Sequence, residues 1–539
     1  MPRDSGKESS GRHAFLVAAG ILISRLVGLV RQGVFAKYFG LSDAGDAFVA
    51  AFRVPNLLQN LFGEGVLSAS FIPVYAKLLA LEDDEESGRV AGAIGAILAL
   101  ISSLVVLIGV VAAPYLIYAI AWGYTGEKGE LTIRLVRILF PGAGLLVCSA
   151  WCLGILNSHR RFFLSYTAPV IWNVAMIATM MWYRGLDETN LAVRLAWGSV
   201  VGSALQFAVQ MPTVLSLVSR LRVRLDLVSA HVREVLRNFA PVFLSRGVVQ
   251  ISAYVDQQIG SFLSEGTMTA LGNVQSMYTL PVSLFGMSIS AAELPAMSST
   301  LGEEAEVAGA LRQRLSVGLR RIAFLVVPSA MAFLALGDTI TAVLYERGKF
   351  THADTIFVWG ILAGSAVGLL ASTLARLYAS TYYALRDTRT PLRYAIVRLV
   401  LTTGLGYVCA FWVPRWMGVD PQWGAAGLTA SAGVAGWVEF ALLRRALNAR
   451  IGNTGVPATM LARLWASAAI GAAAGWWLKP VVFRYGHVVS AVTVLGVYGT
   501  LYFAATYVMG VEECAGTVRR VLRKVGMRAR TTRSSESPP

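Results

Sequence analysis

Several arginines lie inside long apolar stretches of the chain, where a charged side chain is costly. Nine Lys or Arg residues fall within such stretches, and each costs about 2.5–3.5 kcal/mol at the centre of a membrane helix. Arg25, Arg31 and Arg53 lie in the first two stretches, together with Asp46 and Glu64. Guanidinium groups that converge on a cavity would match phosphate oxygens. The pattern predicts a site for an anionic, phosphorylated substrate, and the alternative is internal ion pairs, for example between Arg53 and Asp46.

Two further charges form a second candidate constellation. Asp256 and Arg398 lie in the seventh and eleventh apolar stretches. An intramembrane carboxylate can bind a coupling ion or relay protons, and a structural salt bridge with Arg398 is the alternative. Arg134 and Arg137 are closer to the end of their stretch, and their long side chains are expected to reach the membrane interface. No nucleophile elbow, phosphate-binding loop or zinc motif occurs, so the sequence predicts a protein that is not an enzyme and has no cofactor and no metal site.

Composition shows what must position these charges. Hydrophobic residues make up 55% of the 539 residues and charged residues only 14%, about half the charged share of a soluble protein. Soluble enzymes, disordered chains and disulfide scaffolds are thereby excluded. The net charge of +16 fits basic loops against anionic headgroups better than nucleic-acid binding.

Apolar stretches of spanning length predict an all-α polytopic membrane protein with about fourteen transmembrane helices. Pro55 and Pro73 in the second stretch, and Pro281 and Pro295 in the eighth, predict kinks or breaks. The predicted spans are 13–38, 44–76, 91–121, 131–156, 162–183, 190–217, 238–263, 268–298, 319–345, 353–383, 391–414, 422–443, 456–478 and 487–509.

The distribution of basic residues predicts the orientation. With fourteen spans and both termini in the cytoplasm, cytoplasmic segments hold 30 Lys and Arg residues and outer segments hold 8. Such an excess is strongly positive-inside. Both termini are therefore expected to be cytoplasmic.

An internal repeat predicts two halves. Ser24-Arg25 corresponds to Ser245-Arg246, 221 residues later, and Leu61-Phe62-Gly63 corresponds to Leu284-Phe285-Gly286. Six spans separate the copies, which indicates two parallel six-helix lobes facing a cavity. Arg246 thus joins the substrate-binding candidates. The predicted parts are a cytoplasmic N-terminus (1–12), an N-lobe (13–217), a basic linker expected to form an interfacial amphipathic helix (218–237), a C-lobe (238–449), two further spans (450–510) and a basic cytoplasmic tail (511–539).

Several of these motifs resemble the MurJ (MviN) family. They are SRLVGLVRQGVFAKYFG, DAFVAAFRVPNLLQNLFGEGVLSASFIPVY, GILNSHRRF, SYTAPVIWN, LYERGKFT and RDTRTP, in order from about residue 13 to 510. The resemblance implies fourteen helices in two lobes around a cationic cavity, with the last two helices forming a groove for a lipid tail. It also implies the flipping of lipid II, the undecaprenyl-pyrophosphate-linked peptidoglycan precursor, to the outer leaflet of the bacterial inner membrane.

The family motifs carry over to most of the candidate residues. Arg25 and Arg31 match first-helix arginines of the cavity, Asp46 the acid of the DAF motif, Glu64 the acid after LFG, and Arg53 a position where a basic residue is common.

Three departures from the family pattern concern charge. Gln59 and Asn60 replace a second basic pair, and Gln275 and Ser276 replace an Asp-Arg pair of the eighth helix, for which Arg246 is expected to compensate. Asp256 matches an acid that helps to bind sodium in some relatives. Its eleventh-helix partners are replaced by Arg398 and Thr402, which argues against sodium here and leaves protons or the membrane potential.

The sequence therefore predicts a transporter that flips lipid II by alternating access for cell wall synthesis. Lipid II and membrane lipids are the expected partners, nucleic acid is not, and a monomer in contact with the wall-synthesis machinery is expected. The alternatives are a flippase for another polyprenyl-linked glycan, a drug exporter of the multidrug/oligosaccharidyl-lipid/polysaccharide exporter superfamily that the resemblance implies, and a non-transporting envelope scaffold.

Overall fold

The computed structural model describes the backbone of residues 5–218, 220–290, 293, 297, 304–385 and 387–515. Side chains are described in the same ranges except at 5–19, 21, 64–65, 240–242, 244–253, 256 and 304–305. The regular elements there are helices, as the sequence predicts: α1 (Ser5–Phe39), α2 (Asp43–Phe62), α3 (Glu64–Ala80), α4 (Asp84–Val111), α5 (Ala113–Ile120), α6 (Gly126–Ser158), α7 (Phe162–Trp182), α8 (Glu188–Leu217), α9 (Ala230–Gly260), α10 (Thr267–Pro281), η1 (Val282–Met287), α12 (Glu304–Tyr345), α13 (His352–Ala384), α14 (Arg389–Phe411), α15 (Val413–Met417), η2 (Pro421–Trp423), α16 (Gly424–Ile451), α17 (Ala458–Val482), η3 (Phe483–Tyr485) and α18 (His487–Val508).

Nine of the described helical segments are long and apolar enough to cross a membrane. This confirms the predicted class of a helical polytopic membrane protein, and the count of fourteen stays a prediction. The nine segments are Asp84–Val111, Gly126–Ser158, Phe162–Trp182, Glu188–Leu217, Glu306–Tyr345, His352–Ala384, Arg389–Met417, Pro421–Ile451 and His487–Val508.

The break in the second predicted stretch lies at a glycine and not at a proline. Pro55 and Pro73 are accommodated inside α2 and α3, and the chain leaves helical geometry at Gly63 (φ −84°, ψ −159°). A Cβ at Gly63 would clash with the carbonyl oxygen of Gln59. Glycine therefore permits the sharp junction, and Glu64 begins the next helix.

The eighth stretch changes its helical geometry after a proline. Pro281 ends α10, and Val282–Met287 form a π-helix, η1. Proline lacks the N–H that an α-helix needs at that position, and a wider turn is one way to accommodate the freed carbonyl. The predicted irregularity at Pro281 is thus present, whereas Pro295 lies outside the described residues.

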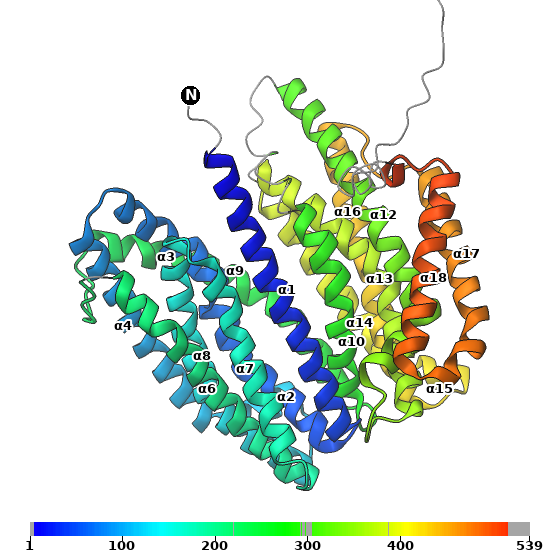
Figure 1. Ribbon diagram of the computed structural model, residues 1–539, viewed down its shortest axis with the longest axis horizontal. Coiled ribbons are helices and arrows are strands. Elements are labelled where there is room, and N and C mark those ends of the chain that lie inside the picture. The colour runs from blue at the N-terminus through cyan, green and yellow to red at the C-terminus, as the bar shows by residue number, and fades with distance from the viewer. Residues whose placement is uncertain are drawn as a thin grey trace, which may run out of the picture. The chain divides into compact units, whose positions relative to one another are not determined.

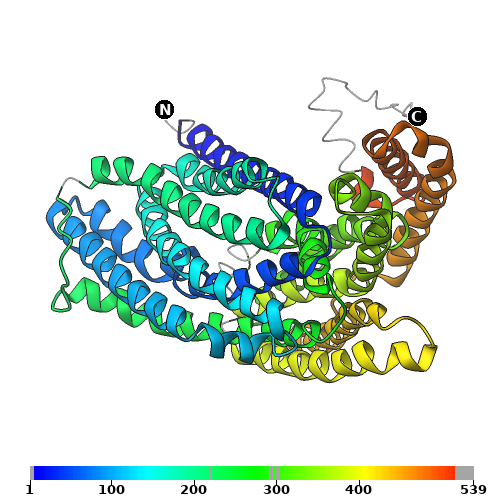
Figure 2. The ribbon, with the colours of Figure 1, turned by 90° about the horizontal axis from the view of Figure 1, so that it is seen from below.

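By packing, the chain divides into two compact units, Met1–Asn273 with Leu344–Thr355, and Val274–Val343 with Ile356–Pro539. In unit 1, α6 packs against α8, α2 and α4, and α7 packs against α1 and α8 (Figures 1 and 2). Two clusters of buried apolar side chains, around Phe48 and Leu139 and around Phe71 and Ile155, hold these helices together. In unit 2, α14 pairs with α16 and α17 with α18.

The first part of the basic linker (218–237) is not the helix that the sequence predicted, whereas residues 230–237 belong to α9. Residues 221–229 have no helical structure, and α9 begins at Ala230, after Ser229 caps its N-terminus. The carbonyl oxygens of Arg220 and Arg222 lie against Gly88 and Gly92 of α4, where a Cβ at either glycine would clash. Arg alternates with Leu and Val in this segment, which suits an extended backbone, whose side chains point alternately to two faces, better than a helix. We call residues 221–229 the strap.

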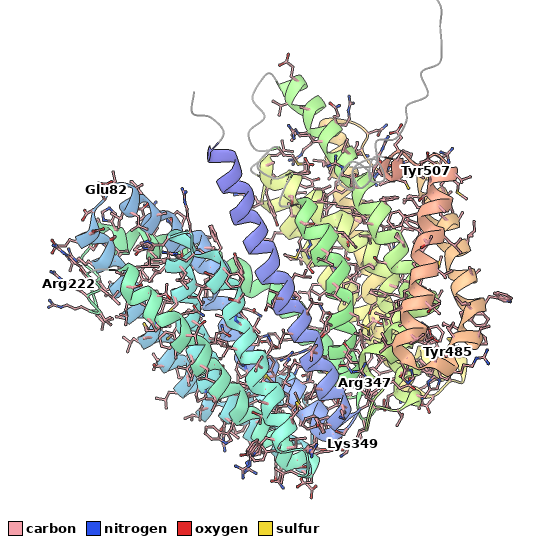
Figure 3. The ribbon with its side chains drawn as sticks, viewed as in Figure 1. Glu82, Arg222, Arg347, Lys349, Tyr485 and Tyr507 are labelled. Atoms are coloured by element: carbon pink, nitrogen blue, oxygen red, sulfur yellow. The ribbon has the colours of Figure 1, made fainter. Side chains whose placement is uncertain are left out.

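Charged side chains gather at the two ends of unit 1. Figure 3 shows Glu82 and Arg222 at one end, and Arg347 and Lys349 at the other, beside the end of α1. At the second end the backbone N–H of Lys349 donates to the carbonyl oxygen of Lys37 (3.0 Å), and its ammonium pairs with Glu188 at 2.5 Å. Polar ends with apolar helices between them are what a membrane-spanning bundle requires.

Candidate functional site

Arg31 is a cation inside the helix bundle of unit 1 without a described carboxylate partner. It lies on α1 and faces α7, with its Cζ atom 4.9 Å from the centre of the Trp172 ring and Nη1 3.6 Å from the Met176 sulfur. Its Nε atom is buried and has no hydrogen-bond partner among the described residues. A ring face and a thioether compensate a buried guanidinium only partly. The described contacts of Arg31 therefore do not neutralise its charge.

A polar cluster that the sequence did not predict lies one residue further along α1. Gln32 Nε2 donates to Asn273 Oδ1 at 2.7 Å, and the Tyr345 hydroxyl donates to the Asn273 carbonyl oxygen at 3.3 Å. Asn273 is fully buried, and its Nδ2 has no described partner. The polar residues Gln32 and Asn273 within apolar stretches were the available signal, but their contact across 241 residues is a product of the fold.

Arg25 lies on a more open part of α1. Its side chain is exposed and has no described ion pair, and the nearby Leu22, Leu26 and Val30 are exposed as well. Arg25 and Arg31 are six positions apart, which amounts to about 9 Å along a helix.

The carboxylate of Asp46 is buried and bonded to other groups of the protein. Its side chain is 1% exposed, and Oδ2 accepts from the ammonium of Lys128 and the N–H of Gly266, both at 2.9 Å. Oδ1 accepts from the N–H of Thr269 at 2.8 Å. The cation partner in this conformation is thus Lys128 of α6, and the arrangement joins α2, α6 and the start of α10. It favours a positioning role for Asp46 over direct substrate contact.

The remaining cavity candidates are placed by their backbones. Arg53 is half-buried on α2, and its carbonyl oxygen accepts from the Tyr254 hydroxyl at 3.5 Å. Glu64 begins α3, and Arg246 and Asp256 lie on α9, but the side chains of these three lie outside the described residues. Since α9 packs against α2 and α3, Arg246 belongs to a helix that borders the first-repeat candidates.

Arg398 has a partner that sequence reasoning missed. In unit 2 its Nη1 lies 3.1 Å from Oε2 of Glu439, which joins α14 to α16. The two residues sit in consecutive spans whose helices pack together, which is the signal that could have suggested the pair. Pairing of Arg398 with Asp256 stays a prediction.

Comparisons with known proteins agree on one family. The model of the family described as lipid II flippase MurJ matches residues 35–496. The chain is 30% identical to "Lipid II flippase MurJ" of Burkholderia cenocepacia over 81% of this chain and 84% of that protein. It is 27% identical to "Probable lipid II flippase MurJ" of Rhizobium meliloti over 96% and 97% of the two chains.

Solved structures give the same fold. A structure of lipid II flippase MurJ in an inward closed conformation superposes with a TM-score of 0.72 at 22% identity, covering 91% of this chain and 99% of that one. An inward-facing multidrug resistance MATE transporter of the MOP superfamily gives 0.65 at 18% identity over 79% and 98%. With the family match extending across most of its helices, this chain belongs to the lipid II flippase MurJ family.

Proposed function

We propose that this protein flips lipid II across the membrane by alternating access, from the cytoplasmic to the outer leaflet, for cell wall synthesis. The observation that carries the proposal is Arg31, a guanidinium inside a helix bundle with no described carboxylate partner and an unsatisfied Nε. A cation in that setting raises the free energy of the protein unless an anion binds to it. The family match supplies the identity of the anion-bearing lipid.

In this mechanism the cations hold the headgroup while the tail stays in lipid. Arg31, with Arg25, Arg53 and Arg246, attracts the pyrophosphate, because guanidinium binds phosphate oxygens through paired N–H donors. Asp46 links α2 to α6 and to the start of α10 through its ion pair and hydrogen bonds. Glu64 lies at the junction that Gly63 creates. Rocking of the two repeats then exposes the pyrophosphate to the other side.

The same proposal includes the setting of the protein. It is a multi-pass membrane protein, for which we infer the bacterial inner membrane, both termini in the cytoplasm and a monomeric state. Contact with the wall-synthesis machinery is part of the proposal. For energy coupling, Asp256 and Arg398 are the candidates. The pairing of Arg398 with Glu439 supports a structural role for Arg398 alongside.

The test compares two substitutions of Arg31 with a control substitution of Arg194, an arginine on α8. Arg31→Gln removes the charge, Arg31→Lys keeps it without the planar fork, and Arg194→Gln removes an exposed intramembrane cation that stacks on Tyr183. Purified variants are titrated with lipid II and with phosphatidylglycerol by native mass spectrometry. The same variants are assayed for complementation of a flippase-depleted strain.

We expect Arg31→Gln to weaken lipid II binding about tenfold or more, the equivalent of about 1.4 kcal/mol, and to abolish complementation. Arg31→Lys should fall between the parent and Arg31→Gln, and Arg194→Gln should behave like the parent. Full complementation and unchanged lipid II binding by Arg31→Gln would contradict the proposal. A parent that binds lipid II no better than phosphatidylglycerol would favour another polyprenyl-linked glycan as the substrate.

A further inference from the structure

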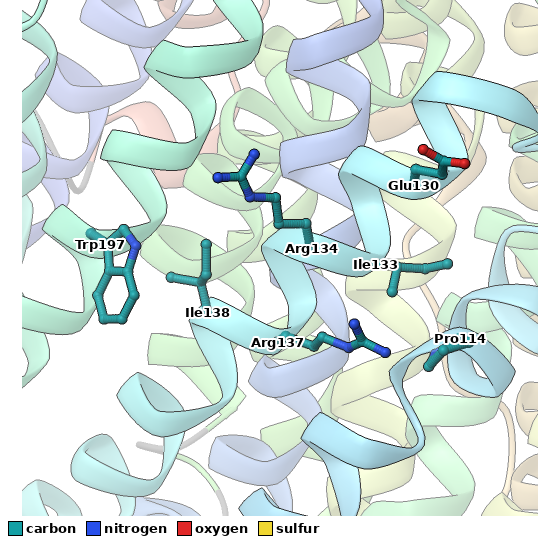
Figure 4. A pocket seen from close by; sticks show the side chains of 7 residues that line it. All are labelled: Pro114, Glu130, Ile133, Arg134, Arg137, Ile138 and Trp197. Carbon is teal, nitrogen blue, oxygen red and sulfur yellow. The ribbon is translucent and has the colours of Figure 1, made fainter.

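A charged groove on the surface of unit 1 has no part in the mechanism above. It has a volume of about 540 Å³ and lies between α5, α6 and α8. Figure 4 shows Glu130, Arg134 and Arg137 on α6, with Trp197 of α8 on one side and Pro114 of α5 on the other. Isoleucine side chains of α6 complete the lining. The groove thus combines two cations with an apolar and aromatic wall.

The two arginines of this groove are available to a ligand. Both side chains are exposed, and neither forms an ion pair or hydrogen bond within the described part of the chain. Glu130, four residues before Arg134, also lines the groove, so the net charge of the three side chains is one positive charge. That charge complements a monovalent anion such as a phosphodiester.

The length of α6 predicts that the groove lies close to the boundary of the hydrocarbon core. A helix of 33 residues such as α6 is about 50 Å long, which exceeds the roughly 30 Å hydrocarbon core by about 10 Å at each end. Arg134 and Arg137 are about 12 Å and 16 Å from the start of α6, so for a core centred on the helix they lie about 2 Å and 6 Å inside its boundary, from where a long arginine side chain reaches the headgroups. Exposed aromatic residues of the kind that mark membrane interfaces occur at the same end of unit 1: Tyr115, Tyr118, Trp122 and Trp182.

The geometry points to a binding site for the headgroup of an anionic phospholipid, with the phosphate held by Arg134 and Arg137. One acyl chain would lie along Trp197 and the isoleucines of α6. By the predicted orientation this is the outer leaflet. A phospholipid is favoured over lipid II because the net charge matches one phosphodiester and not a pyrophosphate. The site is built by unit 1 alone and does not depend on the proposed flipping activity.

The experiment removes the two positive charges of the groove and compares the effect with that of removing two positive charges elsewhere on the protein. Full-length protein in detergent is titrated with phosphatidylglycerol and with phosphatidylcholine, and bound lipids are counted by native mass spectrometry. The test variant is Arg134→Gln/Arg137→Gln. The matched control is Arg184→Gln/Arg415→Gln, which removes two exposed arginines from the same predicted face outside the groove.

We expect the parent to prefer phosphatidylglycerol and the test variant to bind it about tenfold more weakly, with phosphatidylcholine binding unchanged. The control should keep the preference, and added salt should reduce it in the parent. Equal losses in both double variants would indicate a bulk charge effect and overturn the site, as would unchanged binding by the test variant. If the test variant fails to fold, Arg134→Lys/Arg137→Lys must retain most of the preference, and its loss there would also refute the proposal.

Discussion

Asp46 offers the sharpest test of how the helices of unit 1 are held together. Lys128 contacts two carboxylates, the buried Asp46 at 2.9 Å and the exposed Asp43 at 2.7 Å, whose side chains are 1% and 57% exposed. The two ion pairs share one ammonium group and have similar lengths, so they differ chiefly in burial. Asp46→Asn and Asp43→Asn therefore form a matched pair of substitutions.

The expected losses differ several-fold. Asn at position 46 removes the carboxylate charge that pairs with the Lys128 ammonium, which is a loss of about 1.5–3 kcal/mol. Its amide NH₂ would also face a backbone N–H of Gly266 or Thr269, which leaves one buried donor unsatisfied at a further cost of about 1–3 kcal/mol. Since Lys128 keeps Asp43, we expect about 3 kcal/mol in total. For Asp43→Asn, an exposed pair, we expect at most about 1 kcal/mol.

The assay is equilibrium unfolding of the purified protein in detergent, with Lys128→Met completing a double-mutant cycle. A coupling free energy of about 1.5–3 kcal/mol between Asp46 and Lys128 is expected. Equal losses for the two Asp→Asn variants, or strict additivity of Asp46→Asn and Lys128→Met, would refute the argument from burial.

Two further predictions concern the side of the protein that is predicted to be cytoplasmic. Gly92→Ala should loosen the strap, because its Cβ would clash with the Arg222 carbonyl oxygen, and limited trypsin digestion should cut the strap faster than in the parent or in Gly28→Ala, where the added methyl has open space. At Asp387, the backbone N–H of Thr390 is the main cause that lowers the pKa of the carboxyl to about 2, below the usual value of about 3.9. This contribution to stability is present above pH 4 and is lost as the pH falls through about 2. Thermal unfolding should therefore separate Asp387→Asn from the parent at pH 6, and a gap that persists unchanged at pH 2 would contradict the assignment.

Local sequence was sufficient to predict the class of protein and the placement of charges along the chain. Mean hydropathy over a window reports the free energy of transferring that segment, which depends on its own residues and not on its neighbours in space. The helical polytopic class followed from it. Arg31 was identified because a guanidinium in an apolar stretch is anomalous wherever the helix lies.

Local sequence preferences predicted the structure less well where the conformation of a segment depends on the element that packs against it. The strap between Arg220 and Ser229 was predicted to be helical. It is extended instead, and because Gly88 and Gly92 of α4 have no Cβ, its backbone carbonyls can pack directly against that helix. Pro55 and Pro73 were expected to kink or break the second stretch, whereas both lie inside helices and the break lies at Gly63. Turn positions depend on what packs alongside, which a window of sequence does not contain.

The partner of each charge was decided by tertiary structure. Asp46 was weighed against Arg53, seven residues away in the sequence, and its ammonium partner is Lys128, 82 residues away. Arg398 was weighed against Asp256, and the described partner is Glu439 on the helix that packs against its own. Helical periodicity restricts which residues share a face of one helix, but it carries no information about which helix that face meets. The sequence alone thus determined that costly charges lie in apolar stretches, and only the packing of the helices decided that Asp46 and Arg398 are paired while Arg31 keeps a buried donor with no described acceptor.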